Sequence, residues 1–269
     1  MRRRSDAKAL PTVRRALKAS ARAEARYVRD ITGILRGVHE WTMAQLEPEI
    51  ARWEPDSPKR ADGRPNAHHV VSTVLAGLRT HVARHVSDAF DRMAVQVNKK
   101  NIAGMKVLGI PVSPGAQDVL KRARDANIRL VEDAGRAYAQ QVREIFDDPA
   151  NFGLRPEELK AKLLERADVS ESRAQLIARD QTLKTNAALT KDRHEKAGIT
   201  RYRWSGSLDE RERPMHRELE GQIFNWDEPP VTNPQGDENH PGEDYQCRCV
   251  PVPILEEFEE SAELSEAAE

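Results

Sequence analysis

The sequence predicts an α+β protein in which long α-helices precede a small, loop-rich C-terminal module with short β-strands. Up to about residue 198, stretches rich in Ala, Arg and Leu carry apolar residues at helical intervals. After Gly198, glycine, proline and aspartate become frequent and the helical periodicity is lost. The chain is 38% apolar and 32% charged, which favours elongated helices with wide solvated faces, or a subunit whose burial is completed by partners.

The first half of the chain predicts two helical regions joined by a linker. Residues 1–53 form a basic N-terminal segment with a helical pattern from about residue 12. Proline, glycine and charge mark 54–67 as a linker. Residues 68–114 predict a long amphipathic helix of about thirty residues, followed by a break with a short extended piece over Gly104–Gly115.

The second half, residues 115–253, predicts three further helices and then the C-terminal module. One long helix is expected from about Ala116 to Phe146, and a short one begins at Pro156. Ser170 is a candidate N-cap for a third helix that ends at Gly198. The alternating ITRYRW segment predicts a strand at the start of the module, residues 199–253, and residues 254–269 form an acidic tail.

The net charge of −1 conceals two oppositely charged ends. Residues 1–40 hold eleven Arg or Lys against four acids, and residues 256–269 hold seven glutamates and no base. The basic end is expected to contact nucleic acid or an acidic protein surface, although a solvated helix explains it equally well. The arginines expected to make such contacts are Arg2, Arg3, Arg4, Arg14 and Arg15.

The sequence also argues against membrane-spanning, secreted and disulfide-rich proteins. No segment approaches the roughly 20 apolar residues that a membrane span needs. The MRRRSDAK start lacks the apolar core of a signal peptide, so secretion by that route is not expected. The two cysteines cannot form a disulfide framework, and a reducing intracellular compartment fits best.

Both cysteines stand in the stretch HPGEDYQCRC, close to a histidine. A small module with few apolar residues usually needs a metal or a partner to become ordered. Two His and two Cys are suitable ligands for tetrahedral zinc, here His216, His240, Cys247 and Cys249. The C-x-C spacing is unusual, because a flat strand would set the two side chains too far apart for shared ligation without a bend. Free buried thiols therefore remain an alternative, whereas a strained Cys247–Cys249 disulfide is disfavoured.

The segment LDERERPMHRELEG holds alternating charges. It predicts either an exposed, salt-bridged turn or a network in which Asp209, Arg211 and Arg213 lock the turn. A further alternative is an enzyme, a metal-dependent nuclease or hydrolase that uses Asp209, His216 and His240 with an arginine holding a phosphate.

The ordered motifs WSGSLDERERPMHRELEG, WDEPP, HPG and CRCVP resemble the Mu F-like phage head morphogenesis family of minor head, or minor capsid, proteins. The resemblance covers residues 115–253, including NIRLVEDAGRAYAQQVREIF and the helices before ITRYRW. One departure is Asp180-Gln181, where the family usually carries Thr-Glu; the preceding Arg179 is kept and joins the expected network.

The resemblance implies a non-enzymatic component of the virion or prohead, assembled in the bacterial host cytoplasm from a phage or prophage gene. Its implied partners are the portal and the major capsid or scaffolding protein, with DNA as a further partner of the basic N-terminus. The family's His and Cys pattern also looks like a metal site, which favours structural Zn²⁺.

Overall fold

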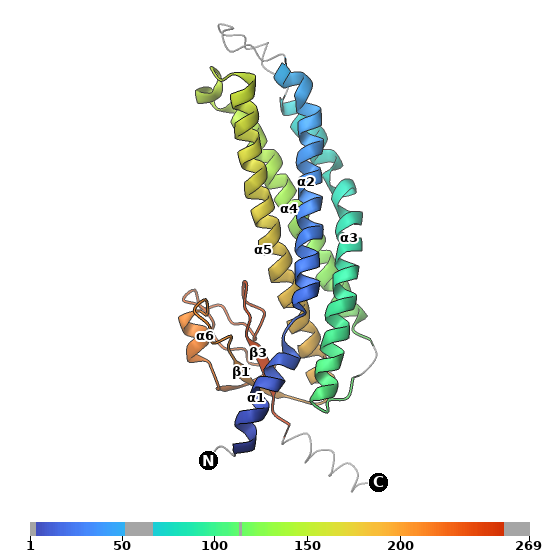
Figure 1. The fold of residues 1–269 in the computed structure, drawn as a ribbon, viewed down its shortest axis with the longest axis vertical. Helices are drawn as coiled ribbons and strands as arrows, with labels where there is room; N and C mark the ends of the chain where they lie inside the picture. The colour runs from blue at the N-terminus through green and yellow to red at the C-terminus, as the bar shows by residue number, and fades with distance from the viewer. Residues whose placement is uncertain (1–3, 52–66, 113–114, 256–269) are drawn as a thin grey trace. The chain divides into compact units, whose positions relative to one another are not determined.

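The computed structural model describes residues 4–51, 67–112 and 115–255 (Figure 1). The predicted linker 54–67, except for its last residue, and the acidic tail after residue 255 lie outside this part of the chain. Arg2, Arg3 and the side chain of Arg4 lie outside it as well.

Long helices followed by a small antiparallel sheet confirm the predicted α+β class. Five α-helices precede the sheet in the described residues, and a sixth lies within the module. They are α1 (Arg4–Leu17), α2 (Ala21–Ala51), α3 (Ala67–Val107), α4 (Gln117–Asp147), α5 (Pro156–Lys196) and α6 (Pro214–Glu218), with a 3₁₀ turn η1 at Pro149–Asn151. Among the described residues, no helix combines the length and apolar character that crossing a membrane requires.

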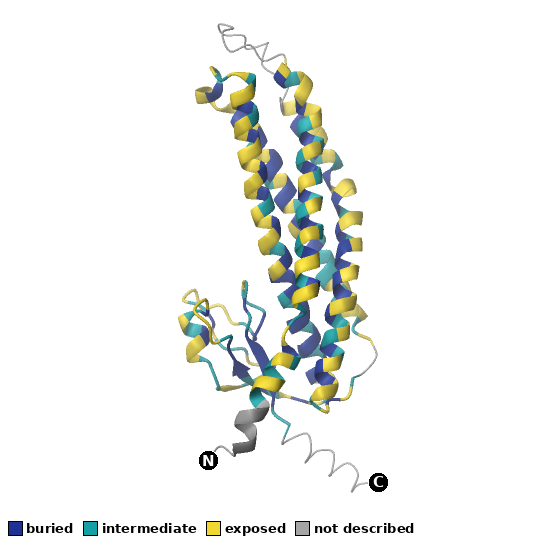
Figure 2. Cartoon of the chain, viewed as in Figure 1, coloured by how far each residue is buried: buried dark blue, intermediate teal, exposed yellow. Residues whose placement is uncertain are grey.

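The described chain forms two compact units. The first unit comprises residues 1–24, 92–123 and 179–269, and the second comprises residues 25–91 and 124–178. In the second unit, segments of α2, α3, α4 and α5 run side by side and turn their buried faces toward one another (Figure 2). The apolar stripe that predicts the amphipathic helix supplies part of this core, through Val71, Val74, Leu78, Val82 and Val86.

The first unit holds the C-terminal module. Its three-stranded antiparallel sheet has the order β2-β1-β3, with β1 at Arg201–Ser205, β2 at Ile223–Asn225 and β3 at Val250–Pro253. Strand β1 pairs with β2, the next strand in sequence, through Tyr202 and Phe224. It pairs on its other side with the distant β3, through Trp204 and Pro251. Pro251 and Pro253 are tolerated because β3 is an edge strand, where a missing N–H need not break a ladder on both sides.

Two apolar clusters hold this unit together. Helix α1 contacts β3, and Leu17 packs with Met105, Ile110, Ile199 and Val250. A second cluster lies around the sheet and combines two tryptophans with both thiols: Tyr202, Trp204, Trp226, Cys247 and Cys249.

Three element boundaries differ from the sequence predictions. The N-terminal helical region is two helices, because Ser20 Oγ accepts the N–H of Ala23 and so caps the start of α2. Helix α3 continues through Gly104 to Val107, and no strand follows in the described part of the expected extended piece. The predicted break before Ser170 is wrong, since α5 is continuous there.

The continuity of α5 has a simple reason. The segment from Ala167 to Ala178 contains neither proline nor glycine, so the i→i−4 hydrogen bonds are not interrupted. Ala167, Ser170, Ala174 and Ala178 are all buried at helical spacing and form one packed face. Ser170 therefore faces the core within a helix instead of capping the start of one.

Candidate metal centre

A short helix and the segment before β3 bring three potential metal ligands together. His216 lies on α6, which Pro214 opens at a position where proline is favoured. Cys247 and Cys249 come directly before β3. The chain reaches them through a turn at Gly242 (φ 89°) and a left-handed residue at Gln246 (φ 54°).

The three side chains have the spacing of tetrahedral ligands. His216 Nδ1 lies 3.5 Å from Cys247 Sγ and 3.5 Å from Cys249 Sγ, and all three ligand atoms lie within 4.8 Å of one another. Zinc–sulfur and zinc–nitrogen bonds of about 2.3 and 2.0 Å at a tetrahedral angle give an N···S edge of about 3.5 Å. The three side chains are buried, with 2–5% of each residue exposed. These three donors therefore fit three of the four coordination positions of a tetrahedral Zn²⁺.

The C-x-C pair converges because its backbone is not part of the sheet. Regular pairing of β3 begins only at Val250. The sequence argument against C-x-C applies to a flat strand, whereas here the pair leaves a turn that is bent at Gln246. The bend that shared ligation requires is thus present.

The other nitrogen of His216 has its own partner. His216 Nε2 lies 3.1 Å from Asp244 Oδ2, and Arg213 Nη1 donates to the same oxygen at 2.9 Å. A second nitrogen of the Arg213 guanidinium donates to the carbonyl of Tyr245. Histidines that ligate a metal commonly donate their remaining N–H to a carboxylate, which fixes the tautomer and the ring orientation. Asp244 is in that position.

The electrostatics of the three groups favour one thiolate. The pKa of Cys247 is lowered well below its ordinary range because the Cys249 thiol donates to its sulfur, with a further contribution from His216 and against the effect of burial. The same hydrogen bond, together with burial, raises the pKa of Cys249. Burial acts to lower the pKa of His216, but contacts with Cys247 and Asp244 outweigh it, so the pKa is raised. A cation between the two sulfurs would favour deprotonation of both thiols.

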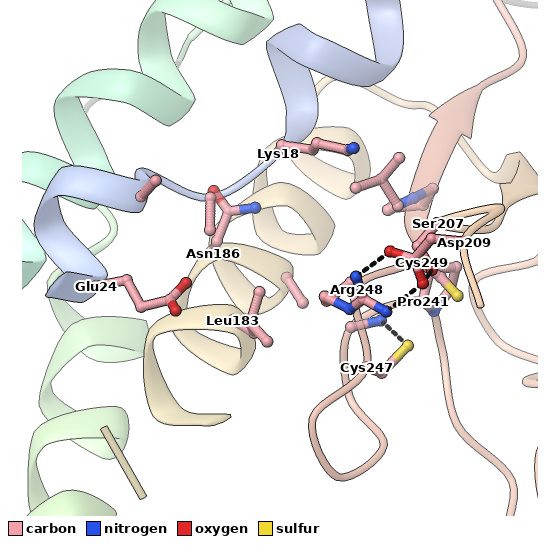
Figure 3. A pocket seen from close by; sticks show the side chains of 16 residues that line it. Lys18, Glu24, Leu183, Asn186, Ser207, Asp209, Pro241, Cys247, Arg248 and Cys249 are labelled. Atoms are coloured by element: carbon pink, nitrogen blue, oxygen red, sulfur yellow. Dashed lines mark hydrogen bonds and ion pairs between the residues drawn. The ribbon is translucent and has the colours of Figure 1, made fainter. Parts of the chain in front are cut away.

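A cavity of about 170 Å³ adjoins the two cysteines (Figure 3). Its walls include Lys18, which follows α1, Glu24 at the start of α2, Leu183 and Asn186 of α5, and Arg248. The Cys247 sulfur accepts from the Gly242 N–H, at 3.3 Å.

His240, the fourth predicted ligand, does not join the group of three. Its Nδ1 lies 2.8 Å from the hydroxyl of Tyr202, and the backbone carbonyl of Trp226 accepts from its ring. The ring packs against Trp226 at a centroid distance of 4.8 Å, and burial lowers the pKa of His240. His240 is therefore a hydrogen-bonded residue of the aromatic core.

The residues expected to form one network lie in separate interactions. Asp209 is exposed and forms a two-pronged ion pair with Arg248, which with the Arg211 N–H lowers the pKa of Asp209 to about 2. Arg211 donates its backbone N–H to Asp209, and its charge also lowers the pKa of that carboxyl. Arg213 holds Asp244, and Arg179 pairs with Glu24 at 3.4 Å. The exposed, salt-bridged turn describes the Asp209 segment better than a buried network does.

Two of the basic N-terminal residues have different environments. Arg14 is half-buried and donates to the carbonyl of Gly206 in the WSGS turn. Arg15 is exposed, and its backbone carbonyl accepts from Lys100. Only Arg15 of this pair presents its side chain to solvent.

Three acids escaped the sequence reasoning. Asp244 stands inside the quoted HPGEDYQCRC stretch, where an acid near a histidine and two cysteines is a usable signal. Glu212 accepts the N–H groups of Ser207 and Leu208, at 2.8 and 2.9 Å, and its Oε1 lies 3.8 Å from Cys249 Sγ. Asp180 of α5, part of the departure from the family pattern, accepts the N–H of Gln246 at 2.7 Å and so holds the cysteine turn.

The proposed catalytic set is also dispersed. Among the described residues, the ligand group that contains His216 includes neither Asp209 nor His240. Asp209 is engaged by Arg248, and His240 by Tyr202 and Trp226.

Over part of its length the chain is similar to uncharacterised proteins. An uncharacterised protein of Haemophilus influenzae is 37% identical over 174 residues, which cover 64% of this chain and 38% of that protein. An uncharacterised protein of Methanocaldococcus jannaschii is 33% identical over 128 residues, which cover 44% of this chain and 18% of that protein. The chain thus spans well under half the length of these curated relatives, and no solved structure matches it.

The family model described as Phage Mu protein F like protein matches residues 140–252, from within α4 to within β3. This range contains the WSGSLDERERPMHRELEG, WDEPP, HPG and CRCVP motifs that carry the resemblance. Residues 140–252 are therefore similar to the Phage Mu protein F like family.

Proposed function

We propose that this protein is a minor head protein that acts in phage head morphogenesis, in the prohead or virion and in the bacterial host cytoplasm during assembly. The observation that carries this proposal is the family match over residues 140–252, which covers the end of α4, all of α5 and nearly all of the sheet module. The long helices with wide exposed faces agree with a subunit that completes its burial on neighbours (Figure 2).

The partners that fit this role are the portal and the major capsid or scaffolding protein. The charge distribution supports contacts of opposite sign, because basic residues dominate positions 1–40 and glutamates dominate positions 256–269. Packaged DNA is a further partner for the basic segment, since phosphate neutralisation needs only exposed Lys and Arg. Arg15 is a described side chain that meets this requirement.

Deletion of the gene from a phage or prophage that encodes the chain tests the role. We expect a loss of DNA-filled heads in electron micrographs and a fall in infectious titre, both restored by the intact gene in trans. Normal numbers of filled, infectious heads after the deletion would contradict the proposal.

Within this role we propose that Zn²⁺ is held by His216, Cys247 and Cys249 and stabilises the module structurally. The support is the convergence of the three buried donors and the placement of Asp244 on the second nitrogen of His216. When bound, the ion would supply a cross-link between α6 and the segment before β3, two parts of the chain that are about thirty residues apart.

Metal analysis of protein purified without a histidine tag tests this site. We expect about one zinc per chain, loss of the zinc in Cys247→Ser, and retention in the matched variant His240→Gln. Less than about 0.2 metal per chain in the wild type, with folding unchanged in Cys247→Ser, would sink the zinc site.

A metal-dependent hydrolase is the second candidate, favoured by one observation. Three ligands beside a cavity are the arrangement in which a catalytic zinc keeps an open position, whereas structural zinc usually has four protein ligands. Against it, Asp209 and His240 have other partners. We expect no cleavage of DNA, RNA or bis(p-nitrophenyl) phosphate by zinc-loaded protein. If the wild type cleaves one of these substrates and a folded His216→Gln variant does not, the role of the site is catalytic instead of structural.

A further inference from the structure

A second pocket of the first unit, remote in sequence from the cysteines, is lined by cations and amides. It has a volume of about 370 Å³ and lies where the end of α3, the start of α4 and the end of α5 meet. Its polar lining is Lys106, Arg193, Asn98 and Gln117, and no acidic residue is among the described residues that line it. The pocket therefore carries two positive charges and no negative one.

Arg193 is a buried cation that lines this pocket. The residue is 4% exposed, and it has no ion pair with any acid among the described residues. Its guanidinium donates to the Oδ1 atoms of Asn101 and Asn98, and its Nε has no acceptor among the described residues. Asp192, the adjacent acid, is paired with Lys196. Burying a charge with only neutral acceptors is unfavourable, and an anion in the pocket would remove much of that penalty.

The amides that hold Arg193 are themselves fixed. Asn101 is buried and donates to Thr190 Oγ1 at 2.8 Å and to Asn186 Oδ1 at 3.1 Å. Asn186 in turn donates to the carbonyl of Leu17 at 2.8 Å. Because this network joins α1, α3 and α5, it holds the guanidinium in place before any ligand binds, which lowers the entropy lost on binding.

Two further features of the pocket favour an anion. Lys106 is exposed, and its ammonium has no hydrogen-bond or ion-pair partner in the described chain. Helix α4 begins at Gln117 on the pocket wall, and Ala116 before it has no side-chain oxygen to cap the first N–H groups. The partial positive charge of a helix N-terminus adds to that of the two side chains. Asp118 lies in the first turn but is exposed and does not line the pocket.

We propose that this pocket binds a phosphate group, between the Arg193 guanidinium, the Lys106 ammonium and the N-terminus of α4. Two full positive charges and a helix dipole match the two negative charges of a phosphate better than the single charge of a carboxylate. The group is either free phosphate or a phosphate of a nucleic acid backbone, since both offer the same oxygens.

Titration of the full chain with inorganic phosphate, followed by isothermal calorimetry, tests the pocket. We expect saturable binding with a Kd of about 1 mM or tighter. Lys106→Gln should weaken it about 5- to 10-fold, because one charge-assisted contact is lost without disturbing a buried residue. The matched control is Lys99→Gln, an exposed lysine of the same helix that does not line the pocket; its affinity should equal that of the wild type.

A second arm distinguishes the two sources of phosphate. The same three proteins are titrated with a single-stranded oligothymidylate of about ten nucleotides. Weaker oligonucleotide binding in Lys106→Gln than in Lys99→Gln assigns the pocket to a nucleic acid backbone. Phosphate binding that depends on Lys106, with no such difference for the oligonucleotide, assigns it to free phosphate.

Arg193→Gln gives an independent check where it remains folded, and should abolish phosphate binding. If phosphate does not bind, or binds equally to Lys106→Gln and Lys99→Gln, the proposal is overturned whatever Arg193→Gln does. Neither result depends on head assembly or on zinc, so this pocket and the proposed function stand or fall separately.

Discussion

His216 meets different partners through its two ring nitrogens. Nδ1 faces the two sulfurs, and Nε2 faces Asp244. This arrangement places a proton on Nε2 and leaves the Nδ1 lone pair for a cation. Arg213 completes the chain of contacts by holding Asp244.

Asp244→Asn tests this orientation. The amide keeps the size of the side chain but removes the negative charge that polarises His216, so we expect zinc affinity to fall about 10- to 100-fold. The measurement is competition with a chromophoric chelator, and the control is Asp227→Asn, an exposed acid of the same module. Equal zinc affinity in the two variants would show that Asp244 does not orient the ligand.

His194 makes stability depend on pH. It is fully buried, neither ring nitrogen has a hydrogen-bond partner in the described chain, and burial lowers its pKa to about 3. The unfolded chain takes up a proton near pH 6.5 and the folded chain does not, so stability is complete above that pH and falls as the pH drops toward 3.

Between pH 7.5 and pH 5 this group alone should lower the free energy of unfolding by about 2 kcal/mol. His194→Leu removes it, so the drop measured by urea denaturation should be smaller by that amount than in the wild type. The matched control is His85→Gln, a change at an exposed histidine without an ion-pair partner among the described residues, and it should leave the drop unchanged. Parallel pH profiles for His194→Leu and the wild type would contradict this account.

At the scale of elements, α1 and α3 approach closely at a glycine. A Cβ on Gly104 would lie 2.5 Å from the carbonyl oxygen of Ala16. The sequence suggests Gly104 as a helix breaker, but within α3 its function is to admit the backbone of α1. A glycine in a helical pattern can mark the end of a helix or a position where another helix packs closely. The packing of the neighbouring helix decides which of the two applies.

Gly104→Ala should therefore destabilise the protein by about 1–3 kcal/mol, because backbone on α1 must move. The same substitution at Gly33, an exposed position of α2 with nothing within 4 Å of the new Cβ, should be stabilising by up to about 1 kcal/mol. Thermal or urea denaturation of the two variants gives the comparison. Equal effects at both glycines would show that α1 does not press on Gly104.

Local pattern predicted the elements better than it predicted the site. The stripe from Val71 to Val86 and the apolar alternation of Tyr202 and Trp204 describe one face of one element, so periodicity is sufficient to find them. The continuous α5 was missed because a serine that suits an N-cap also packs well inside a helix. Such choices depend on what lies opposite the residue.

The site depended on pairs that no local pattern encodes. His216 was predicted with Cys247 and Cys249 from residue type alone, and its partner Asp244 was not. Asp180 meets Gln246 across 66 residues of sequence, and His240 turned toward Tyr202 instead of the cysteines. Tertiary contacts of this kind depend on how the chain folds, so local sequence patterns cannot predict them.

At the scale of the whole molecule, the charge distribution and the relatives bear on which partners the protein contacts. The chain spans 38% of the Haemophilus influenzae relative, so the partners of that longer protein are not those of this chain by default. The first forty residues are strongly basic, and the structure separates an arginine that serves the fold from one that faces solvent.

This separation predicts different effects at Arg14 and Arg15. If the basic segment neutralises DNA phosphates, Arg15→Gln should weaken binding to any sequence and reduce the slope of log K against log salt by about one. Arg14→Gln should instead lower the unfolding temperature, since it removes the contact with Gly206. Fluorescence anisotropy at several salt concentrations measures the first effect and thermal denaturation the second. Unchanged salt dependence in Arg15→Gln would remove Arg15 from the DNA-binding residues.

The order of the strands has a consequence for synthesis of the chain. The central strand β1 is complete at Ser205, but its second neighbour β3 begins only at Val250, immediately after both thiols. A ribosome must therefore translate some forty-five more codons before β1 gains its outer edge and His216 gains its sulfurs. Until then the growing polypeptide exposes Trp204 and an unpaired strand edge. A stop codon between residues 206 and 250 would consequently leave β1 without its β3 neighbour and His216 without the two sulfurs.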